Sequence, residues 1–240
     1  MRYLMHVTYN GQNYNGYQKQ ASGSTIQSEL EKAIFVCLKD EVTCTASGRT
    51  DAKVSAYNQP VHFETEKAFD LRKFLKSING ILPEDIKVLK IEPTTLHARF
   101  SAKRKTYVYK MYVSDVKLPL YEYALNIPTS TNLKIAKQFC KMVVGTHDFK
   151  GFEASGSETE TTVRTIYSCK LKKENGMLNF YVTGNGFLYK MVRNLVGTML
   201  AVSSGKIDLK TLKTTMFSTY KCTHTAKPDY LYLYNVKYQK

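Results

Sequence analysis

The chain has 240 residues, enough for one large domain or two small ones around a substantial buried core. Hydrophobic residues make up 43% and charged residues 23% of it, the balance of an ordinary globular protein. Lys and Arg outnumber Asp and Glu by 35 to 20, which gives a formal net charge of +15. Such a charge indicates either a polyanionic partner, nucleic acid or an anionic membrane, or simply a lysine-rich solvated surface.

Cysteines, histidines and apolar stretches exclude several protein classes. The five cysteines are widely spaced and form no C-x-x-C pair, so neither a disulfide framework nor a zinc site is expected, and a reducing cytoplasm fits. The histidines show no metal-binding spacing, so no metal is expected. The N-terminus lacks the apolar core of a signal peptide, and no apolar stretch is long enough to span a bilayer, so we expect no membrane association.

The first half of the chain predicts alternating strands and helices. Strands are expected at residues 3–9, 42–46, 60–64 and 86–88, and helices at residues 26–38 and 70–80. Ser24-Thr25-Ile26-Gln27 fits a capping box at the start of the first helix. Asp70 caps the second helix, and Asn79-Gly80 is expected to close it.

The second half repeats a similar order of elements. Strands are expected at residues 107–113, 166–172, 178–183 and 230–238, and helices at residues 133–144, 191–200 and 209–217. Residues 153–162 are polar and aperiodic and are expected to form a mobile loop.

These patterns predict an α+β fold of two similar α/β subdomains. Their mostly antiparallel sheets are expected to join into one central sheet flanked by helices, with an active-site cleft between the subdomains. The expected domains are residues 1–98, with the loop around Asp51, and residues 99–240, with the strand of Tyr107 and the helix of Arg193.

Three segments carry candidate chemistry. Gly48-Arg49-Thr50-Asp51-Ala52 places a cation and a carboxylate on a turn after a strand, where catalytic groups are often displayed, although an isolated Gly-x-x-Asp turn is more often structural. Residues 103–110 join a basic cluster to an aromatic strand, as in proteins that stack nucleic-acid bases, or form a core face with solvated lysines. Arg193, if its helix packs inward, needs a carboxylate partner such as Asp51; otherwise it lies on the surface.

The three segments occur together with other runs in a fixed order, and in this the chain resembles the TruA family of tRNA pseudouridine synthases along nearly its whole length. The matching runs are Tyr14-Asn15-Gly16-Tyr17-Gln18, Gly48-Arg49-Thr50-Asp51-Ala52, Val61-His62-Phe63, His97-Ala98-Arg99-Phe100-Ser101-Ala102, Lys105-Thr106-Tyr107-Val108-Tyr109, Gly145-Thr146-His147-Asp148-Phe149, residues 191–197 and Leu231-Tyr232-Leu233.

The resemblance implies an isomerase that converts uridine to pseudouridine in the anticodon stem-loop of tRNA, at tRNA positions 38–40, with no cofactor and no metal. It implies that Asp51 is the catalytic carboxylate, which either attacks C1′ or removes the 2′ proton. It further implies that Arg49 holds the flipped nucleotide, that Tyr107 stacks on the target base, and that Arg193 pairs with Asp51 and keeps it ionised. The implied partners are tRNA and a second copy of the chain in a homodimer.

The chain departs from the family pattern beside Asp51. Lys53 stands where the family has glycine, and if that position needs a positive φ the substitution costs about 1–2 kcal/mol. Ser55 replaces a histidine, Asn10 an aspartate and Tyr17 a tryptophan or phenylalanine. These departures leave open two alternatives, a diverged paralogue acting on another RNA and a non-catalytic RNA-binding protein that kept the fold.

Overall fold

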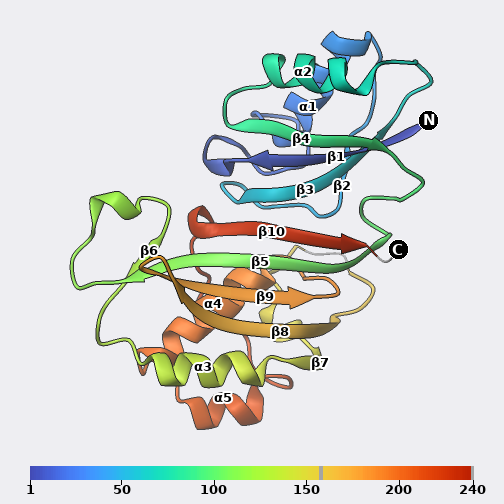
Figure 1. Ribbon diagram of the computed structural model, residues 1–240. Coiled ribbons are helices and arrows are strands. Elements are labelled where there is room, and N and C mark those ends of the chain that lie inside the picture. Colours follow the sequence, from blue (N-terminus) through green and yellow to red (C-terminus); the bar gives the residue numbers. More distant parts are fainter. Residues whose placement is uncertain (157–158, 239–240) are drawn as a thin grey trace. The chain divides into compact units, whose positions relative to one another are not determined.

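A computed structural model describes residues 1–156 and 159–238 of the chain (Figure 1). Its residues form two compact units: Met1–Lys103 together with the chain from Tyr232 onward, and Arg104–Leu231. The expected domains placed the boundary after residue 98 and the last strand in the second domain. In the structure this strand belongs with the first unit, because it pairs there with a strand of that unit.

The first unit contains a sheet in the order β4-β1-β3-β10, with a short β2 beside β3. Strand β1 (Arg2–Tyr9) is antiparallel to both β3 (Ser55–Glu64) and β4 (Ile86–Pro93). Strand β10 (Leu231–Tyr238) is parallel to β3. Strand β2 is only Thr45–Ala46, shorter than the expected 42–46, whereas β3 begins five residues before the expected Pro60.

Two helices, α1 (Ile26–Leu38) and α2 (Leu71–Ile81), pack on this sheet and on each other (Figure 1). Their buried faces supply Ile26, Leu30, Ile34, Phe74 and Ile78, and the ring of Phe74 stacks on that of Phe63 in β3. The hydrophobic effect of burying these large side chains is the main stabilisation of the unit.

The helix ends of the first unit differ in detail from the expectation. The capping box is formed one residue later, by Thr25 and Ser28, each side chain accepting from the other residue's backbone N–H. Asp70 caps α2 as predicted, through a hydrogen bond from the N–H of Lys73. The helix continues through Asn79 to Ile81 and ends before Pro83, since the residue preceding a proline is driven to an extended conformation.

The second unit has a sheet in the order β5-β9-β8-β7, with antiparallel neighbours. Its strands are β5 (Ala102–Val113), β7 (Gly145–Asp148), β8 (Val163–Glu174) and β9 (Met177–Gly184); a short β6 (Leu125–Ile127) runs parallel to β5. Strands β6 and β7 were not predicted, because neither is long enough to show a clear alternation.

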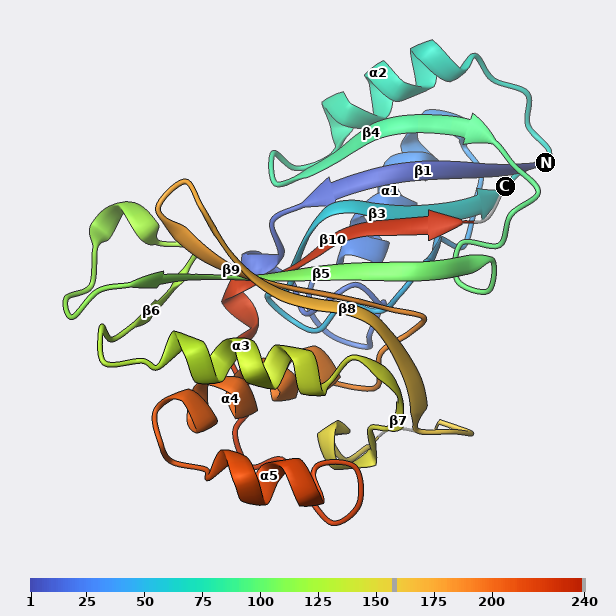
Figure 2. The same cartoon turned by 60° about the horizontal axis from the view of Figure 1, so that its bottom comes forward.

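Three helices belong to the second unit: α3 (Leu133–Met142), α4 (Met191–Ser203) and α5 (Leu209–Thr215). Figure 2 shows α3 beside β8 and α4, with α5 farther from the sheet. Helix α4 is buried along most of its length, including Leu195, Val196 and Met199. A side chain at Gly197 would meet the carbonyl of His224, so glycine is required for the chain to pass this closely.

The predicted α+β class, with mostly antiparallel strands and flanking helices, is confirmed. Residues 153–156 and 159–162 of the expected loop form no helix or strand, and residues 157–158 lie outside the described residues. No helix in the described part of the chain is long and apolar enough to cross a membrane.

Candidate active site

The loop that carries Asp51 connects β2 to β3 and is held at its start by β3. The backbone N–H of Ser47 donates to the carbonyl of Pro60 at 2.8 Å. The side-chain amide of Gln59, fully buried, donates to the carbonyl of Gly48 at 2.6 Å. A buried amide held in this way fixes the position of the backbone that it binds.

The centre of the loop is fixed at Thr50. Its hydroxyl lies 2.8 Å from the hydroxyl of Tyr9 in the buried interior, and its carbonyl accepts from the N–H of Tyr17. Gly16 has a φ of +86°, and a Cβ there would lie 2.7 Å from the Thr50 carbonyl oxygen. Glycine is required at this position both by the backbone conformation and by the close approach of the loop.

Asp51 begins a tight turn that ends at Val54, whose N–H donates to the Asp51 carbonyl at 3.1 Å. The third residue of the turn, Lys53, has a φ of +67°. The structure therefore shows that this position has the positive φ considered in the sequence analysis. The turn leaves the Asp51 side chain half-buried, while the side chains of Lys53 and Arg49 are exposed.

Ser55, at the start of β3, has a structural role in this arrangement. Its buried hydroxyl accepts the backbone N–H of Gly11 at 3.0 Å. Gly11 in turn lies against the carbonyl of Val54, too close for any side chain. The residue that departs from the family pattern therefore ties the segment after β1 to the end of the Asp51 loop.

Tyr107 and Arg193 lie in the second unit. Tyr107 is in β5, opposite Val182 of β9, and its ring packs edge-on against Phe187 with 5.2 Å between centroids. Only 9% of Tyr107 is exposed, so its ring is positioned by the surrounding core. The stacking of this ring on a base stays a prediction.

Arg193 lies in the first turn of α4 and is half-buried. Its Nε donates to the carbonyl of Ala226 at 2.8 Å, and the N–H of Ala226 donates to the carbonyl of Arg193. The bond from Nε orients the guanidinium, and the half-buried side chain lies between the buried and the surface alternatives considered from the sequence. An oriented guanidinium is suited to a carboxylate because it presents several donors in one plane.

Tyr109, two residues along β5 from Tyr107, was not singled out from the sequence. It is fully buried, and its hydroxyl has no hydrogen-bond partner among the described residues. Burial and the neighbouring Tyr230 raise the pKa of Tyr109, while the positive charge of Arg193 acts in the opposite direction. Tyr109 therefore lies within electrostatic range of the predicted Asp51 partner.

The structure thus places Arg49 and Asp51 on one anchored loop of the first unit, and Tyr107 and Arg193 on β5 and α4 of the second unit. The pairing of Asp51 with Arg193 joins residues of different units and stays a prediction. Tyr9 and Gln59, which hold the loop, were missed from the sequence because a buried strand tyrosine and a strand glutamine carry no local signal of the loop that they contact.

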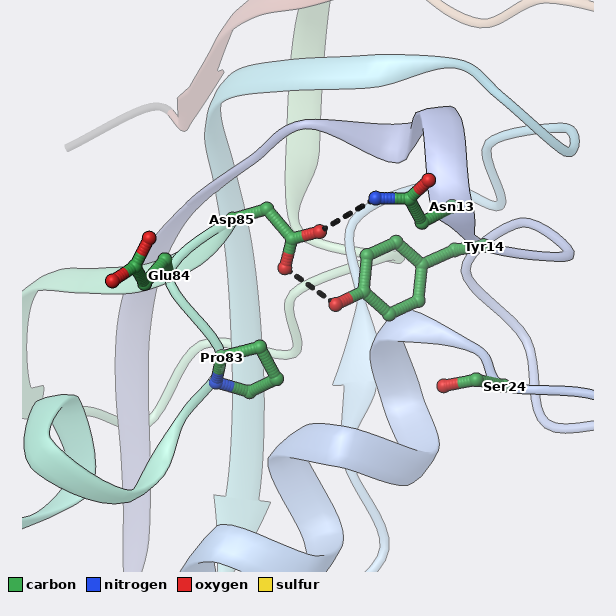
Figure 3. A pocket seen from close by; sticks show the side chains of 6 residues that line it. All are labelled: Asn13, Tyr14, Ser24, Pro83, Glu84 and Asp85. Carbon is green, nitrogen blue, oxygen red and sulfur yellow. Dashed lines mark hydrogen bonds between the residues drawn. The ribbon is translucent and has the colours of Figure 1, made fainter.

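An open pocket of about 480 Å³ in the first unit is lined by Asn13, Tyr14, Ser24, Pro83, Glu84 and Asp85 (Figure 3). Asp85 accepts hydrogen bonds there from the Tyr14 hydroxyl at 2.5 Å and from the Asn13 amide at 3.4 Å, and Glu84 also lines the wall. Burial and the bond to Asp85 raise the pKa of Tyr14. Two carboxylates make this cavity unsuitable for phosphate, and none of the four predicted site residues lines it.

No group of three His, Cys, Asp or Glu side chains among residues 1–156 and 159–238 could hold a metal ion. The Asp51 loop presents a half-buried carboxylate. An ionised Asp51 can act as a nucleophile or as a base toward a substrate that reaches it.

Comparison with known proteins identifies the family. A family model described as tRNA pseudouridine synthase matches residues 139–239, which include Arg193. The tRNA pseudouridine synthase A of Anoxybacillus flavithermus is 37% identical over 97% of this chain and 96% of its own length. The proteins of the same name from Exiguobacterium sp. and Streptococcus agalactiae are 37% and 35% identical, over 98% and 99% of this chain and 96% and 95% of their own. The chain therefore belongs to the tRNA pseudouridine synthase A family.

Proposed function

We propose that the protein is a tRNA pseudouridine synthase, an isomerase that converts uridine to pseudouridine in the anticodon stem-loop of tRNA. The observation that carries the proposal is the Asp51 loop. In a chain 37% identical to a tRNA pseudouridine synthase A over 97% of its residues, this carboxylate stands half-buried on a turn anchored by Tyr9, Gly16 and Gln59.

The proposed reaction needs no external reactant. The N1–C1′ bond of the target uridine breaks, the uracil turns, and a C5–C1′ bond forms; C5 loses its hydrogen as a proton and N1 gains one. The atoms and electrons balance within the nucleotide and the solvent. The two routes open to a carboxylate, attack on C1′ and removal of the 2′ proton, both begin with an ionised Asp51.

The other predicted residues bind the substrate and keep Asp51 ionised. The target base has to leave its stack, which costs a few kcal/mol. The exposed Arg49 binds and holds the flipped nucleotide, and the fixed ring of Tyr107 stacks on the base. Arg193 pairs with Asp51 and keeps it ionised, since an adjacent positive charge favours the charged form of a carboxylate.

The substrate also explains the charge of the chain. With a net charge of +15, the protein repels itself unless its surface faces a polyanion. We propose that tRNA is that polyanion, that the protein acts in the cytoplasm where tRNA is modified, and that it works as a homodimer, as the family resemblance implies. Sedimentation of the purified protein, alone and with tRNA, tests the homodimer: a mass of one chain at micromolar concentration would contradict it.

The activity is tested by tritium release from tRNA containing 5-³H-uridine, because forming the C5–C1′ bond expels the hydrogen from C5. The wild-type protein is expected to release tritium, and Asp51→Asn, which keeps the shape and removes the charge, is expected to release none. Asp115→Asn is the matched control, since Asp115 is also a turn carboxylate but lies in an exposed turn, where it accepts from Thr129.

Release by Asp51→Asn at the wild-type rate would overturn the role of Asp51. Tight tRNA binding by the wild-type protein with no pseudouridine formed on any tRNA would instead favour the non-catalytic alternative.

A further inference from the structure

The turn that presents Asp51 contains a lysine where its backbone favours glycine. In Asp51–Val54 the third residue, Lys53, has a φ of +67°, the positive φ that a type II turn requires at that position. Glycine reaches this region without steric hindrance, whereas a lysine Cβ crowds the neighbouring carbonyl oxygen.

The surroundings impose this conformation, and the lysine side chain does not cause it. The N–H of Lys53 donates to the carbonyl of Tyr14 at 3.3 Å, and its carbonyl accepts from the side-chain amide of Gln12 at 3.4 Å. Gly11 packs directly against the carbonyl of the next residue, Val54. The backbone of the turn is thus fixed from outside, and Lys53 occupies a strained position there.

A positive φ alone does not indicate a function. Lys39 has a φ of +53° as the C-cap of α1, where its N–H donates to the Phe35 carbonyl and its side chain is exposed. Lys53 differs from Lys39 in its position next to the predicted catalytic residue. It lies two residues after Asp51, as Arg49 lies two residues before it, and both basic side chains are exposed beside a half-buried carboxylate.

We propose that Lys53 binds a phosphate of the RNA strand next to the target nucleotide and is a substrate-binding residue of this chain. The inference rests on the proposed function. A target nucleotide at Asp51 brings its own backbone phosphates to the edge of the loop, where the exposed Lys53 side chain supplies a positive charge in addition to that of Arg49. Strain retained beside a reacting group is typical of residues kept for binding or catalysis.

The test compares two glycine substitutions in the same backbone conformation. Lys53→Gly and Lys39→Gly each remove one lysine and its strain. Lys39 serves as the distant control, because it lies at the C-terminal end of α1, about 20 Å from the N-terminal end of the helix that contacts Gly16. Both variants are expected to raise the thermal unfolding midpoint, by about 2–4 °C. Only Lys53→Gly is expected to weaken the binding of a tRNA transcript, roughly three- to tenfold.

Salt dependence identifies the phosphate contact. The slope of log Kd against log salt is expected to fall by about 0.7–0.9 in Lys53→Gly and to stay unchanged in Lys39→Gly. Lys53→Asn, which tolerates positive φ but carries no charge, is expected to behave as Lys53→Gly in binding, and Lys53→Arg to bind as the wild type. In tritium release the loss is expected in KM, with kcat nearly unchanged.

Equal tRNA affinity and an equal salt slope in Lys53→Gly and the wild type would overturn the inference while leaving the proposed function intact. A wild-type protein that releases no tritium from any tRNA would overturn the proposed function and, with it, this inference. The two failures are distinguishable, because the first is read from tRNA binding by Lys53→Gly and the second from tritium release by the wild-type protein.

Discussion

The hydroxyl of Tyr9 lies 2.8 Å from the hydroxyl of Thr50, the residue directly before Asp51, and both side chains are buried. The contact joins the end of β1 to the middle of the loop that presents the carboxylate. It links the core of the first unit to the residue before the predicted catalytic group.

Tyr9→Phe is expected to lower the rate of tritium release by roughly tenfold through kcat, with a smaller effect on KM. The substitution leaves the buried Thr50 hydroxyl without this partner, at a cost of about 1–2 kcal/mol, and loosens the residue before Asp51. Tyr3→Phe, on the same strand, is the control, because the Tyr3 hydroxyl donates to the sulfur of Met1 at 3.3 Å, a contact outside the Asp51 loop. Equal rates for the two variants would contradict a positioning role for Tyr9.

Gly16→Ala is expected to destabilise the first unit by more than 2 kcal/mol. Its φ of +86° is strained for alanine, and the new Cβ would lie 2.7 Å from the Thr50 carbonyl oxygen, which is backbone and can move only with the loop. Gly80→Ala gives the opposite sign, about 0.5–1 kcal/mol of stabilisation, because Gly80 lies in α2 with open space around it. Urea unfolding of both variants measures the difference, and a Gly16→Ala variant as stable as the wild type would contradict the close approach.

Tyr109→Phe is expected to stabilise the protein by about 1 kcal/mol. The substitution removes a fully buried hydroxyl that has no hydrogen-bond partner among the described residues and keeps the ring against Tyr230. Tyr112→Phe on the same strand should instead destabilise by about 1 kcal/mol, because the Tyr112 hydroxyl accepts the N–H of Leu118. Thermal unfolding distinguishes the two, and loss of stability in Tyr109→Phe would show that its hydroxyl is bonded.

The pH dependence of stability is expected to contain a contribution from His62. Burial, followed by the nearby His97, lowers the pKa of His62 from 6.5 to about 4, and its Nδ1 accepts the N–H of Ala98. Because the unfolded chain takes up this proton first as the pH falls, the contribution is complete above pH 6.5 and is lost between pH 6.5 and about 4.

His62→Gln keeps an oxygen acceptor for Ala98 and removes the titration. Its free energy of unfolding is therefore expected to fall less than that of the wild type between pH 7 and pH 4.5, by about 1–2 kcal/mol. Urea unfolding at several pH values measures both slopes. If the free energy of unfolding changed with pH equally in the two proteins, His62 would be excluded as the source of this pH dependence.

The elements that could be predicted from the sequence are those with long periodic patterns and local caps. Helix α1 shows apolar residues at helical spacing from Ile26 onward, and Asp70 marks the start of α2 by its own side chain. The capping box was predicted one residue too early because Ser24 and Thr25 are both good N-caps. The choice of Thr25 depends on a contact distant in sequence, in which the N–H of Ile26 donates to the carbonyl of Gly16.

The contacts that shape the candidate site could not be predicted in this way. Gln59 and Gly48 are separated by half a strand and a loop, and the role of Gln59 depends on the register of β3 with its neighbours. Lys53 could be recognised as a candidate for positive φ only because a turn glycine was expected there. Its exposure, and the hydrogen bonds that impose its conformation, follow from the packing of residues 11–14 against the loop.

Strand β10 has a consequence for how the protein is made. It pairs with β3 at Ser55 and Ala56, immediately after the Asp51 turn, yet it is encoded after the whole of the second unit. During translation, β3 is made more than a hundred residues before β10, so this edge of β3 has no partner strand until the second unit has been synthesised. A message that stops before residue 231 encodes Asp51, Tyr107 and Arg193 but cannot complete the sheet that supports the first of them.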